Sequence, residues 1–234
     1  MKSLGILKAD NVHPQLAPQF GEYPAMFTRI FQSHLPDLAV KAYDTLKFEY
    51  PTDLDEVDAY LITGSATSVY EAHAWIKQLG DFIKKLHAHR KKLIGICFGH
   101  QLIAHVLGGK TEKSDRGWGI GFYPLQLTDL GEQFIDHPFP LRLFYSHQDQ
   151  VVVPAKGSKT LASSEFCPYG ICKIDEHILT AQCHIEMPKA YGKALFAMRR
   201  ERYGETLYQH AIQSMEGRDD TNVFVKYIIE FIWK

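Results

Sequence analysis

The sequence has no long hydrophobic run, no excess of charge of one sign and few cysteines. No stretch approaches the roughly 18 consecutive apolar residues that a membrane-spanning helix needs. Lysines and arginines number 26 against 27 aspartates and glutamates, so the charge does not favour binding to nucleic acid or to an anionic membrane surface. The apolar run near the N-terminus is interrupted too soon for a signal peptide. These absences predict a cytoplasmic protein without nucleic-acid or membrane partners.

The four cysteines form no C-x-x-C pair, so in a reducing compartment we expect free thiols. The chain also lacks internal repeats, low-complexity tracts and the G-x-x-x-x-G-K-[ST] loop of many nucleotide-binding proteins. Its 234 residues are 45% hydrophobic and 23% charged, which is an ordinary globular composition. We therefore expect one domain, with room for a small appendage, and no bound cofactor.

Short apolar runs alternate with amphipathic segments over the first half of the chain. Strands are predicted at Ser3–Ala9, Leu38–Tyr43, Ala59–Thr63 and Lys92–Ile96, and helices at Tyr23–Leu35, His73–His89 and Gln101–Leu107. The longer helical segments repeat apolar residues with the period of one helix face. Strands that alternate with helices favour right-handed crossovers and a mainly parallel sheet. The expected fold class is therefore α/β.

The pattern changes from about Gly119. Strands separated by turns, typical of a mixed or antiparallel sheet, are predicted at Gly121–Leu127, Arg142–Tyr145, Val151–Val153, Tyr169–Ile174 and Ile178–His184. The end of the chain is predicted to be helical, at Ala190–Arg202, Thr206–Met215 and Asn222–Trp233. We expect a main domain, residues 1–189, with a helical extension, residues 190–234, packed on it. The apolar face of the last helix favours core packing over a partner site: Phe224, Tyr227, Ile228 and Phe231.

A cysteine flanked by glycines lies between a predicted strand and a predicted helix. The segment Gly95-Ile96-Cys97-Phe98-Gly99 has the G-x-nucleophile-x-G spacing of the turn that carries the serine of many hydrolases. Such a turn raises the sulfur above the carboxyl ends of the strands, at the positive end of a helix. We interpret Cys97 as a nucleophile. The alternatives are a buried structural cysteine and a metal site with His100, which lacks a second ligand pair at zinc-like spacing.

A catalytic thiol needs an imidazole base, and the imidazole needs a partner that fixes its tautomer. Among twelve histidines, His184 follows the late apolar run Ile178–Gln182 and precedes Glu186 by two residues. In an extended segment these two side chains point to the same face, while Ile185 points to the other. The carboxylate of Glu186 can then lie beside the His184 ring. The spacing also fits a histidine at a strand end with an unrelated surface glutamate.

Two motifs together resemble the class I glutamine amidotransferases: Gly95-Ile96-Cys97-Phe98-Gly99-His100-Gln101 and His184-x-Glu186. The resemblance extends to the amidotransferase domain of GMP synthetases and to the stand-alone gamma-glutamyl peptidases. The resemblance runs from Met1 to about Lys189 and implies that residues 1–189 are the catalytic domain. It implies a flavodoxin-like three-layer fold with a central, mostly parallel sheet and a site at the carboxyl edge of that sheet.

The resemblance implies a catalytic triad of Cys97, His184 and Glu186. Cys97 is expected to attack an amide carbonyl and form a gamma-glutamyl thioester. His184 is expected to protonate the leaving amine and then activate water, while Glu186 orients the imidazole. The family's oxyanion hole uses backbone amides, which correspond here to Phe98 and to the loop residues Gly64 and Ser65. Without the resemblance, Gly64-Ser65 is a simple turn signal.

Further residues are expected to bind the substrate by the same resemblance. Gln101 lies one helical turn after the cysteine, where the family contacts the glutamyl group. The segment 145–151 is similar to the one that lines the pocket for the amino acid end of the substrate, which implies contacts by Tyr145, Ser146 and His147. Without the resemblance, this segment is equally a polar connection between strands.

Two positions depart from the family pattern. Ile185 stands where the family commonly has the proline of His-Pro-Glu, and Gly64-Ser65 stands where Gly-Gly-Pro is commoner. The first change is compatible with an extended backbone. The second lies in the loop that contributes to the oxyanion hole. It therefore leaves open whether the protein hydrolyses glutamine as an ordinary glutaminase does.

Three functions follow from these features. The favoured one is a stand-alone hydrolase that cleaves a gamma-glutamyl amide bond in a small molecule, either glutamine or a gamma-glutamyl peptide, without a metal. The second is a glutaminase subunit that supplies ammonia to a separate synthetase partner, since the length leaves no room for a synthetase domain. The third is a non-catalytic regulatory module of the same fold. The intact Cys97, His184 and Glu186 argue against the third.

Overall fold

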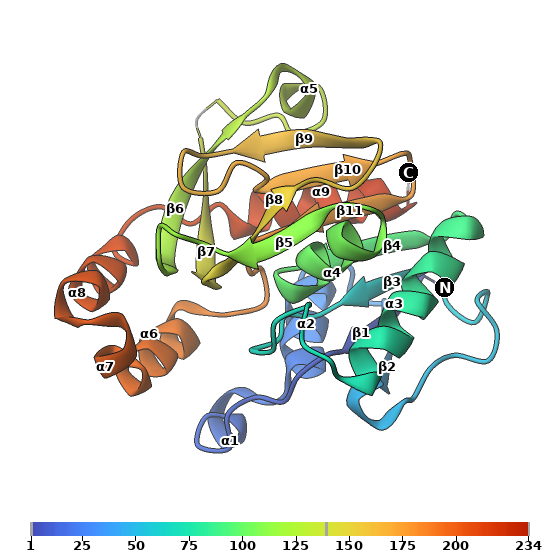
Figure 1. Ribbon diagram of the computed structural model, residues 1–234, viewed down its shortest axis with the longest axis horizontal. Helices are drawn as coiled ribbons and strands as arrows, with labels where there is room; N and C mark the ends of the chain where they lie inside the picture. Colours follow the sequence, from blue (N-terminus) through green and yellow to red (C-terminus); the bar gives the residue numbers. More distant parts are fainter. Residues whose placement is uncertain (1, 139, 234) are drawn as a thin grey trace.

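The computed structural model describes residues 2–138 and 140–233. Met1, where the predicted main domain begins, and Lys234, where the predicted helical extension ends, lie outside the described residues. Over the described residues, the main sheet has nine strands in the order β2-β1-β3-β4-β11-β10-β9-β6-β7, and β5 and β8 form a second sheet (Figure 1). Five strands are parallel: β1 (Ser3–Lys8), β2 (Ala39–Asp44), β3 (Ala59–Ile62), β4 (Lys92–Ile96) and β11 (Ile178–Ala181).

The remaining strands pair antiparallel. They are β5 (Lys110–Lys113), β6 (Gly119–Leu127), β7 (Leu141–His147), β8 (Asp149–Val153), β9 (Ser158–Ser163) and β10 (Ile171–Ile174). Helices α2 (Tyr23–Gln32) and α9 (Thr221–Trp233) cover one face of the parallel strands, and α3 (Ala74–Ala88) and α4 (Phe98–Val106) cover the other (Figure 1). The predicted α/β fold, with three layers around a parallel centre, is confirmed.

Other helices lie outside these layers. They are α1 (Ala17–Phe20), α5 (Asp129–Glu132), α6 (Lys189–Met198), α7 (Arg200–Tyr203) and α8 (Glu205–Ser214), with a 3-10 turn at Thr45–Lys47. Helices α6, α7 and α8 form a lobe beside β6 and β7 (Figure 1). Their buried residues share one apolar cluster with α1 and with Phe144 of β7.

The parallel strands are apolar on both sides because helices cover both sides. In β4, Ile94 and Ile96 pack with α2 and α9, whereas Leu93 packs with α3 and α4. The neighbouring strand β3 alternates in the same way, with Leu61 on the first side and Ile62 on the second. This two-sided burial holds the carboxyl ends of β1, β3, β4 and β11 in fixed positions at one edge of the sheet.

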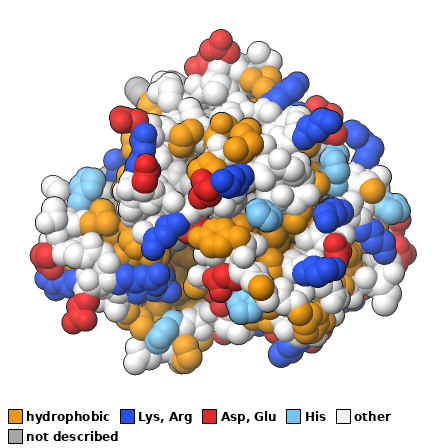
Figure 2. Space-filling model, in the orientation of Figure 1, with side chains coloured by type: hydrophobic (Ala, Val, Ile, Leu, Met, Phe, Trp, Pro, Cys, Tyr) orange, Lys and Arg blue, Asp and Glu red, His pale blue; other side chains and the backbone are white. Residues whose placement is uncertain are grey.

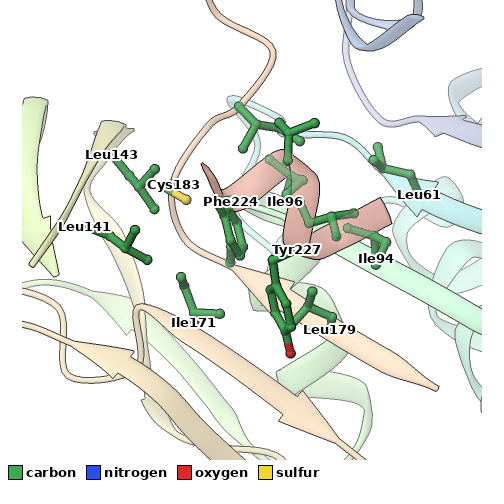
Figure 3. Packing of buried hydrophobic residues seen from close by; sticks show 14 of the residues in the cluster. Leu61, Ile94, Ile96, Leu141, Leu143, Ile171, Leu179, Cys183, Phe224 and Tyr227 are labelled. Carbon is green, nitrogen blue, oxygen red and sulfur yellow. The ribbon is translucent and has the colours of Figure 1, made fainter. Parts of the chain in front are cut away.

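The C-terminal helix belongs to the main core. Phe224 and Tyr227 of α9 lie among side chains from β4, β7, β10 and β11, including Leu141, Leu143 and Ile171 (Figure 3). The apolar face that predicted core packing is therefore buried against strands of residues 1–189. The division of the chain at residue 189 stays a prediction.

Truncation of a single α9 side chain tests how far the extension contributes to stability. Phe224 is fully buried, so we expect Phe224→Ala to lower the free energy of unfolding by about 3–5 kcal/mol. Chemical denaturation followed by tryptophan fluorescence measures the change. Phe48→Ala is the matched control, because Phe48 is 49% exposed and its truncation should change stability by about 0.5 kcal/mol or less. Equal effects of the two variants would contradict the packing role of α9.

Several boundaries differ from the predictions for local reasons. Helix α4 begins at Phe98 instead of Gln101, because Cys97 itself ends the extended backbone. Strand β11 ends at Ala181, three residues before His184, which joins β7 only through an isolated bridge to Phe144. Strands β5 and β9 were not predicted, because their polar sequences lack the alternation of a half-buried strand.

Candidate active site

Cys97 lies in a strained turn between β4 and α4. Its backbone has φ 51° and ψ −101°, a conformation that non-glycine residues rarely adopt. The turn is held on both sides: the Cys97 amide donates to the Ala181 carbonyl at 2.8 Å, and the Gln101 amide donates to the Cys97 carbonyl at 3.0 Å. The predicted strand-turn-helix around the cysteine is present, with the sulfur-bearing residue at the first turn of a helix.

The two glycines of the motif are required by close packing. A Cβ atom at Gly95 would lie 2.6 Å from Ile103 Cδ1 and 2.8 Å from the backbone of Gly99. A Cβ atom at Gly99 would lie 2.7 Å from the Ile62 carbonyl oxygen. Any larger residue would therefore push α4 away from β3 and β4 and displace Cys97.

His184 and Glu186 form a buried hydrogen-bonded pair. His184 Nδ1 donates to Glu186 Oε1 at 2.8 Å, and the two residues are 3% and 4% exposed. The second carboxylate oxygen accepts a hydrogen bond from the Ile185 amide at 3.0 Å. A proline at position 185 has no such donor, so this departure from the family pattern supplies an additional contact to Glu186. The side chain of Ile185 points into the core, as predicted.

The charge state of His184 follows from its neighbours. Burial alone would lower the pKa of His184, but the negative charges of Glu186 and Cys97 outweigh burial and raise this pKa to about 10. The imidazole is therefore protonated at neutral pH. Its other nitrogen, Nε2, is buried and makes no hydrogen bond of ordinary length to the described residues. A protonated ring with one nitrogen held by a carboxylate has the arrangement of a general acid.

The loop that follows β3 packs against both of these groups. A Cβ atom at Gly64 would lie 2.8 Å from His184 Cε1 and 3.6 Å from Cys97 Cβ. Asp10, which follows β1, holds the loop by accepting a hydrogen bond from the Ala66 amide at 2.7 Å. The buried Thr63 hydroxyl accepts from the Ala9 amide at 2.9 Å. The ends of two neighbouring parallel strands thus position the loop beside the sulfur.

A cavity of about 550 Å³ opens beside Cys97. Figure 2 shows this face of the molecule hollowed, with apolar side chains in the hollow and Lys and Arg side chains next to it over α6 and α7. The predicted site residues on its wall are Cys97, His184, Gly64, Ser65, Gln101, Ser146 and His147. Two others, Glu186 and Phe98, are buried directly behind that wall.

Tyr145 is the exception, and its expected contact with the substrate stays a prediction that its position in the structure does not favour. The residue is not on the cavity wall and is fully buried in the core cluster that contains α9. Successive side chains of a strand point to opposite faces. In β7, Leu141, Leu143 and Tyr145 all point to the α9 side, while Ser146 points to the cavity.

A buried glutamine that the sequence did not single out contacts the nucleophile. Gln182 Nε2 donates to Cys97 Sγ at 3.6 Å, and Gln182 Oε1 accepts from Gln101 Nε2 at 3.1 Å. Gln101 Nε2 also donates to the Asp149 carbonyl at 2.7 Å. Gln182 is fully buried and follows an apolar strand, and a polar residue in such a run needs partners. That position was the available signal.

His147 differs from His184 in charge. Burial lowers the pKa of His147 to about 3, because no carboxylate offsets the loss of solvent. The ring is therefore neutral at physiological pH. Its Nδ1 donates to the Asp149 carbonyl at 3.1 Å, so Nε2 is left as an acceptor.

The residues that the structure describes include neither a candidate membrane span nor a candidate metal centre. No helix among them is long and apolar enough to cross a membrane. No group of three or more His, Cys, Asp or Glu side chains in that part of the chain is arranged to hold a metal ion.

Comparison with known proteins gives consistent matches. A glutamine amidotransferase-like protein of Schizosaccharomyces pombe is 28% identical over 98% of this chain and 98% of its own length. Gamma-glutamyl peptidase 2 of Arabidopsis thaliana is 31% identical, and the match spans 61% of this chain and 59% of the peptidase. The crystal structure of a glutamine amidotransferase from Thermotoga maritima shares the fold, with a TM-score of 0.79, 18% identity, and coverage of 100% of this chain and 99% of that one.

The family assignment rests on the sequence model of the class-I glutamine amidotransferases, described as "Glutamine amidotransferase class-I". It matches residues 27–199, a span that contains the cysteine turn, the loop after β3 and the His184–Glu186 pair. This chain belongs to the class-I glutamine amidotransferase family.

Proposed function

We propose that this protein hydrolyses a gamma-glutamyl amide bond through a triad of Cys97, His184 and Glu186. The observation that carries the proposal is the charged His184–Glu186 pair, buried beside a cysteine in a strained turn on a cavity wall. The Glu186 carboxylate fixes the tautomer of His184, and the protonated ring stabilises a thiolate on Cys97.

The proposed reaction has two steps that balance in atoms and protons. In the first, the Cys97 thiolate attacks the gamma-carbonyl carbon, His184 gives its proton to the amide nitrogen, and the C–N bond breaks to leave a thioester and a free amine. In the second, His184 removes a proton from water, the hydroxide attacks the thioester, and the C–S bond breaks. Glutamate is released, and the Cys97 thiolate and the protonated His184 are restored.

The negative oxygen formed in each step requires hydrogen-bond donors. We assign this role to the backbone amides of Phe98, Gly64 and Ser65, since Phe98 begins α4 and the loop lies against Cys97. Gln101, Ser146 and His147 are proposed to bind the amino acid end of the substrate, because their side chains lie on the same cavity wall. Loss of one hydrogen-bond donor from an oxyanion hole typically lowers turnover by about 10²–10³-fold.

The test is a direct assay of purified protein with glutamine and with a gamma-glutamyl dipeptide, in which glutamate and the released amine are both quantified. We expect release of glutamate from at least one of the two substrates. Absence of release from both would contradict the proposed hydrolase. A supply of ammonia to a synthetase partner remains an alternative prediction, for which glutamine hydrolysis should be slow alone and stimulated by the partner.

Substitution of Gly64 tests the role of the loop after β3. The added methyl group of Gly64→Ala would lie 2.8 Å from the His184 ring, so the ring or the loop must shift. Because misplacement by about 1 Å can lower turnover about 100-fold, we expect a loss of that size in kcat with an unchanged circular dichroism spectrum. Ser65→Ala is the matched control, since it keeps the backbone amide and should retain most of the activity. Similar losses in both variants would contradict a backbone role.

A further inference from the structure

The cavity continues well beyond the residues assigned to the chemistry. Its volume of about 550 Å³ lies within the range of about 300–1,000 Å³ that holds drug-sized ligands, which are larger than one amino acid. Part of its wall comes from the lobe of α6 and α7 and from the segment before β6: Trp118, Tyr191, Leu195, Arg199 and Arg202. None of these residues has a role in the cleavage steps.

Two arginines face this part of the cavity. Arg199 lies at the break between α6 and α7, Arg202 lies on α7, and both side chains line the cavity. The Arg202 guanidinium stacks over the Trp118 ring, 4.5 Å from its centroid. Within residues 2–138 and 140–233, no carboxylate lies within 4.0 Å of either guanidinium. The intervening Arg200, by contrast, pairs with Glu205 through two contacts of 2.5 and 2.6 Å.

The other charged and titratable groups on this wall leave an excess of positive charge. Lys113 and His13 line the same cavity, and the acidic side chains on its wall are those of Asp10 and Asp149, two against the three of Lys113, Arg199 and Arg202. Both oxygens of Asp10 are already engaged, by the Asn11 amide at 2.8 Å and the Ala66 amide at 2.7 Å. Arg199 is close enough to lower the pKa of Asp10, although burial raises this pKa overall. The guanidinium groups are thus available to an anion from solution.

The arginine lobe is attached on the His184 side of the site. Phe196 of α6 stacks on Phe144 with the ring centroids 5.4 Å apart, and the Phe144 ring contacts the His184 ring at 6.5 Å. In the proposed reaction His184 gives its proton to the leaving nitrogen. The part of the substrate attached to that nitrogen therefore extends toward α6 and α7.

We propose that Arg199 and Arg202 bind the carboxylate of the leaving group. The preferred substrate is then a gamma-glutamyl peptide with a free C-terminal carboxylate, rather than glutamine, whose leaving group is ammonia. This inference rests on the proposed hydrolase function. The planar guanidinium forms paired hydrogen bonds with a carboxylate, and Trp118 holds one of the two guanidinium groups in place by stacking.

The experiment compares gamma-glutamylalanine with its C-terminal amide, in which a neutral group of nearly the same size replaces the carboxylate. Values of kcat/KM are measured for the unmodified protein and for Arg199→Gln, Arg202→Gln and the control Arg200→Gln. Dissociation constants of both dipeptides are measured by calorimetry on a Cys97→Ala background, so that binding is read without cleavage. We expect the unmodified protein to prefer the carboxylate about tenfold or more. Arg199→Gln and Arg202→Gln should each reduce this preference several-fold, while Arg200→Gln leaves it unchanged.

The two readouts separate failure of this inference from failure of the hydrolase proposal. Cleavage of both dipeptides at equal rates, or a preference that survives both substitutions, would overturn the carboxylate site and leave the hydrolase intact. If neither dipeptide is cleaved, the dissociation constants from calorimetry test the carboxylate site without the reaction. Tighter binding of the carboxylate form that depends on Arg199 and Arg202 would support the site, and equal binding of the two dipeptides would overturn it.

Discussion

Replacement of Cys97 by serine is expected to lower the turnover of gamma-glutamyl substrates by about 10⁴-fold or more. The strained turn holds the sulfur in place, and the protonated His184 ring and the amides at the start of α4 put positive charge beside it. A serine hydroxyl ionises far less readily than a thiol, so the same surroundings do not make it a comparable nucleophile. Loss of the nucleophile in a serine protease lowers kcat by about 10⁶-fold.

Both the rate and the covalent intermediate can be measured. After rapid acid quenching during turnover, we expect mass spectrometry to find the gamma-glutamyl group on the peptide that contains Cys97. Cys172→Ser is the control, because Cys172 is also buried but is not on the wall of this cavity. Undiminished turnover by Cys97→Ser, or a thioester on another cysteine, would rule out the proposed nucleophile.

Replacement of Glu186 by glutamine is expected to lower kcat by about 10²–10⁴-fold. Glutamine has nearly the same shape, but its amide can present a donor to His184 Nδ1 and thereby favour the wrong tautomer. The side-chain exposures of His184 and Glu186 are 3% and 0%, so no water replaces the lost carboxylate. Glu216→Gln is the control, since Glu216 is largely exposed and forms an ion pair with Lys193 at 3.0 Å.

The same substitution should change the pH dependence in a defined direction. Glu186 is one of the charges that raise the pKa of His184 to about 10, so its neutralisation lowers that pKa. We expect the alkaline limb of the kcat profile to move to lower pH in Glu186→Gln and to stay in place in Glu216→Gln. An alkaline limb that does not move would show that His184 does not act as the acid.

The free energy of unfolding should also depend on the protonation of His184. Because the pKa of folded His184 is higher than the ordinary value of about 6.5, protonation of the ring adds stability that is fully present below pH of about 6.5. This contribution is lost as the pH rises through about 10. The difference in free energy of unfolding between the unmodified protein and Glu186→Gln is therefore expected to shrink over this range.

The predictions that succeeded depend on residues close together in the chain. The glycines at positions 95 and 99 and the cysteine between them act within one turn, and Glu186 reaches His184 across a single residue. The apolar runs of β1, β3 and β4 reflect burial between two layers of helices. Such patterns can be read from the sequence because local geometry and burial on both faces determine them.

Other features required distant segments to meet. Gln182 and Gln101 are far apart in the chain, and their hydrogen bond exists only because β11 pairs with β4. Tyr145 and Ser146 are adjacent, yet only Ser146 faces the cavity, because the core seals the other face of β7. No sequence pattern could place Arg199 and Arg202 opposite Trp118, since their position depends on how α6 packs on Phe144.

The α/β class and the strand-turn-helix around Cys97 could be read from the sequence alone, because continuous burial and short-range geometry set them, whereas the spacing of His184 and Glu186 left their pairing open. The packed structure was needed to show that His184 pairs with Glu186, which polar side chains share a cavity, how large that cavity is, and which charged side chains line it. Side-chain direction and the packing of helices on strands result from contacts between segments that are remote in the chain, and these contacts leave no periodic signal in the sequence.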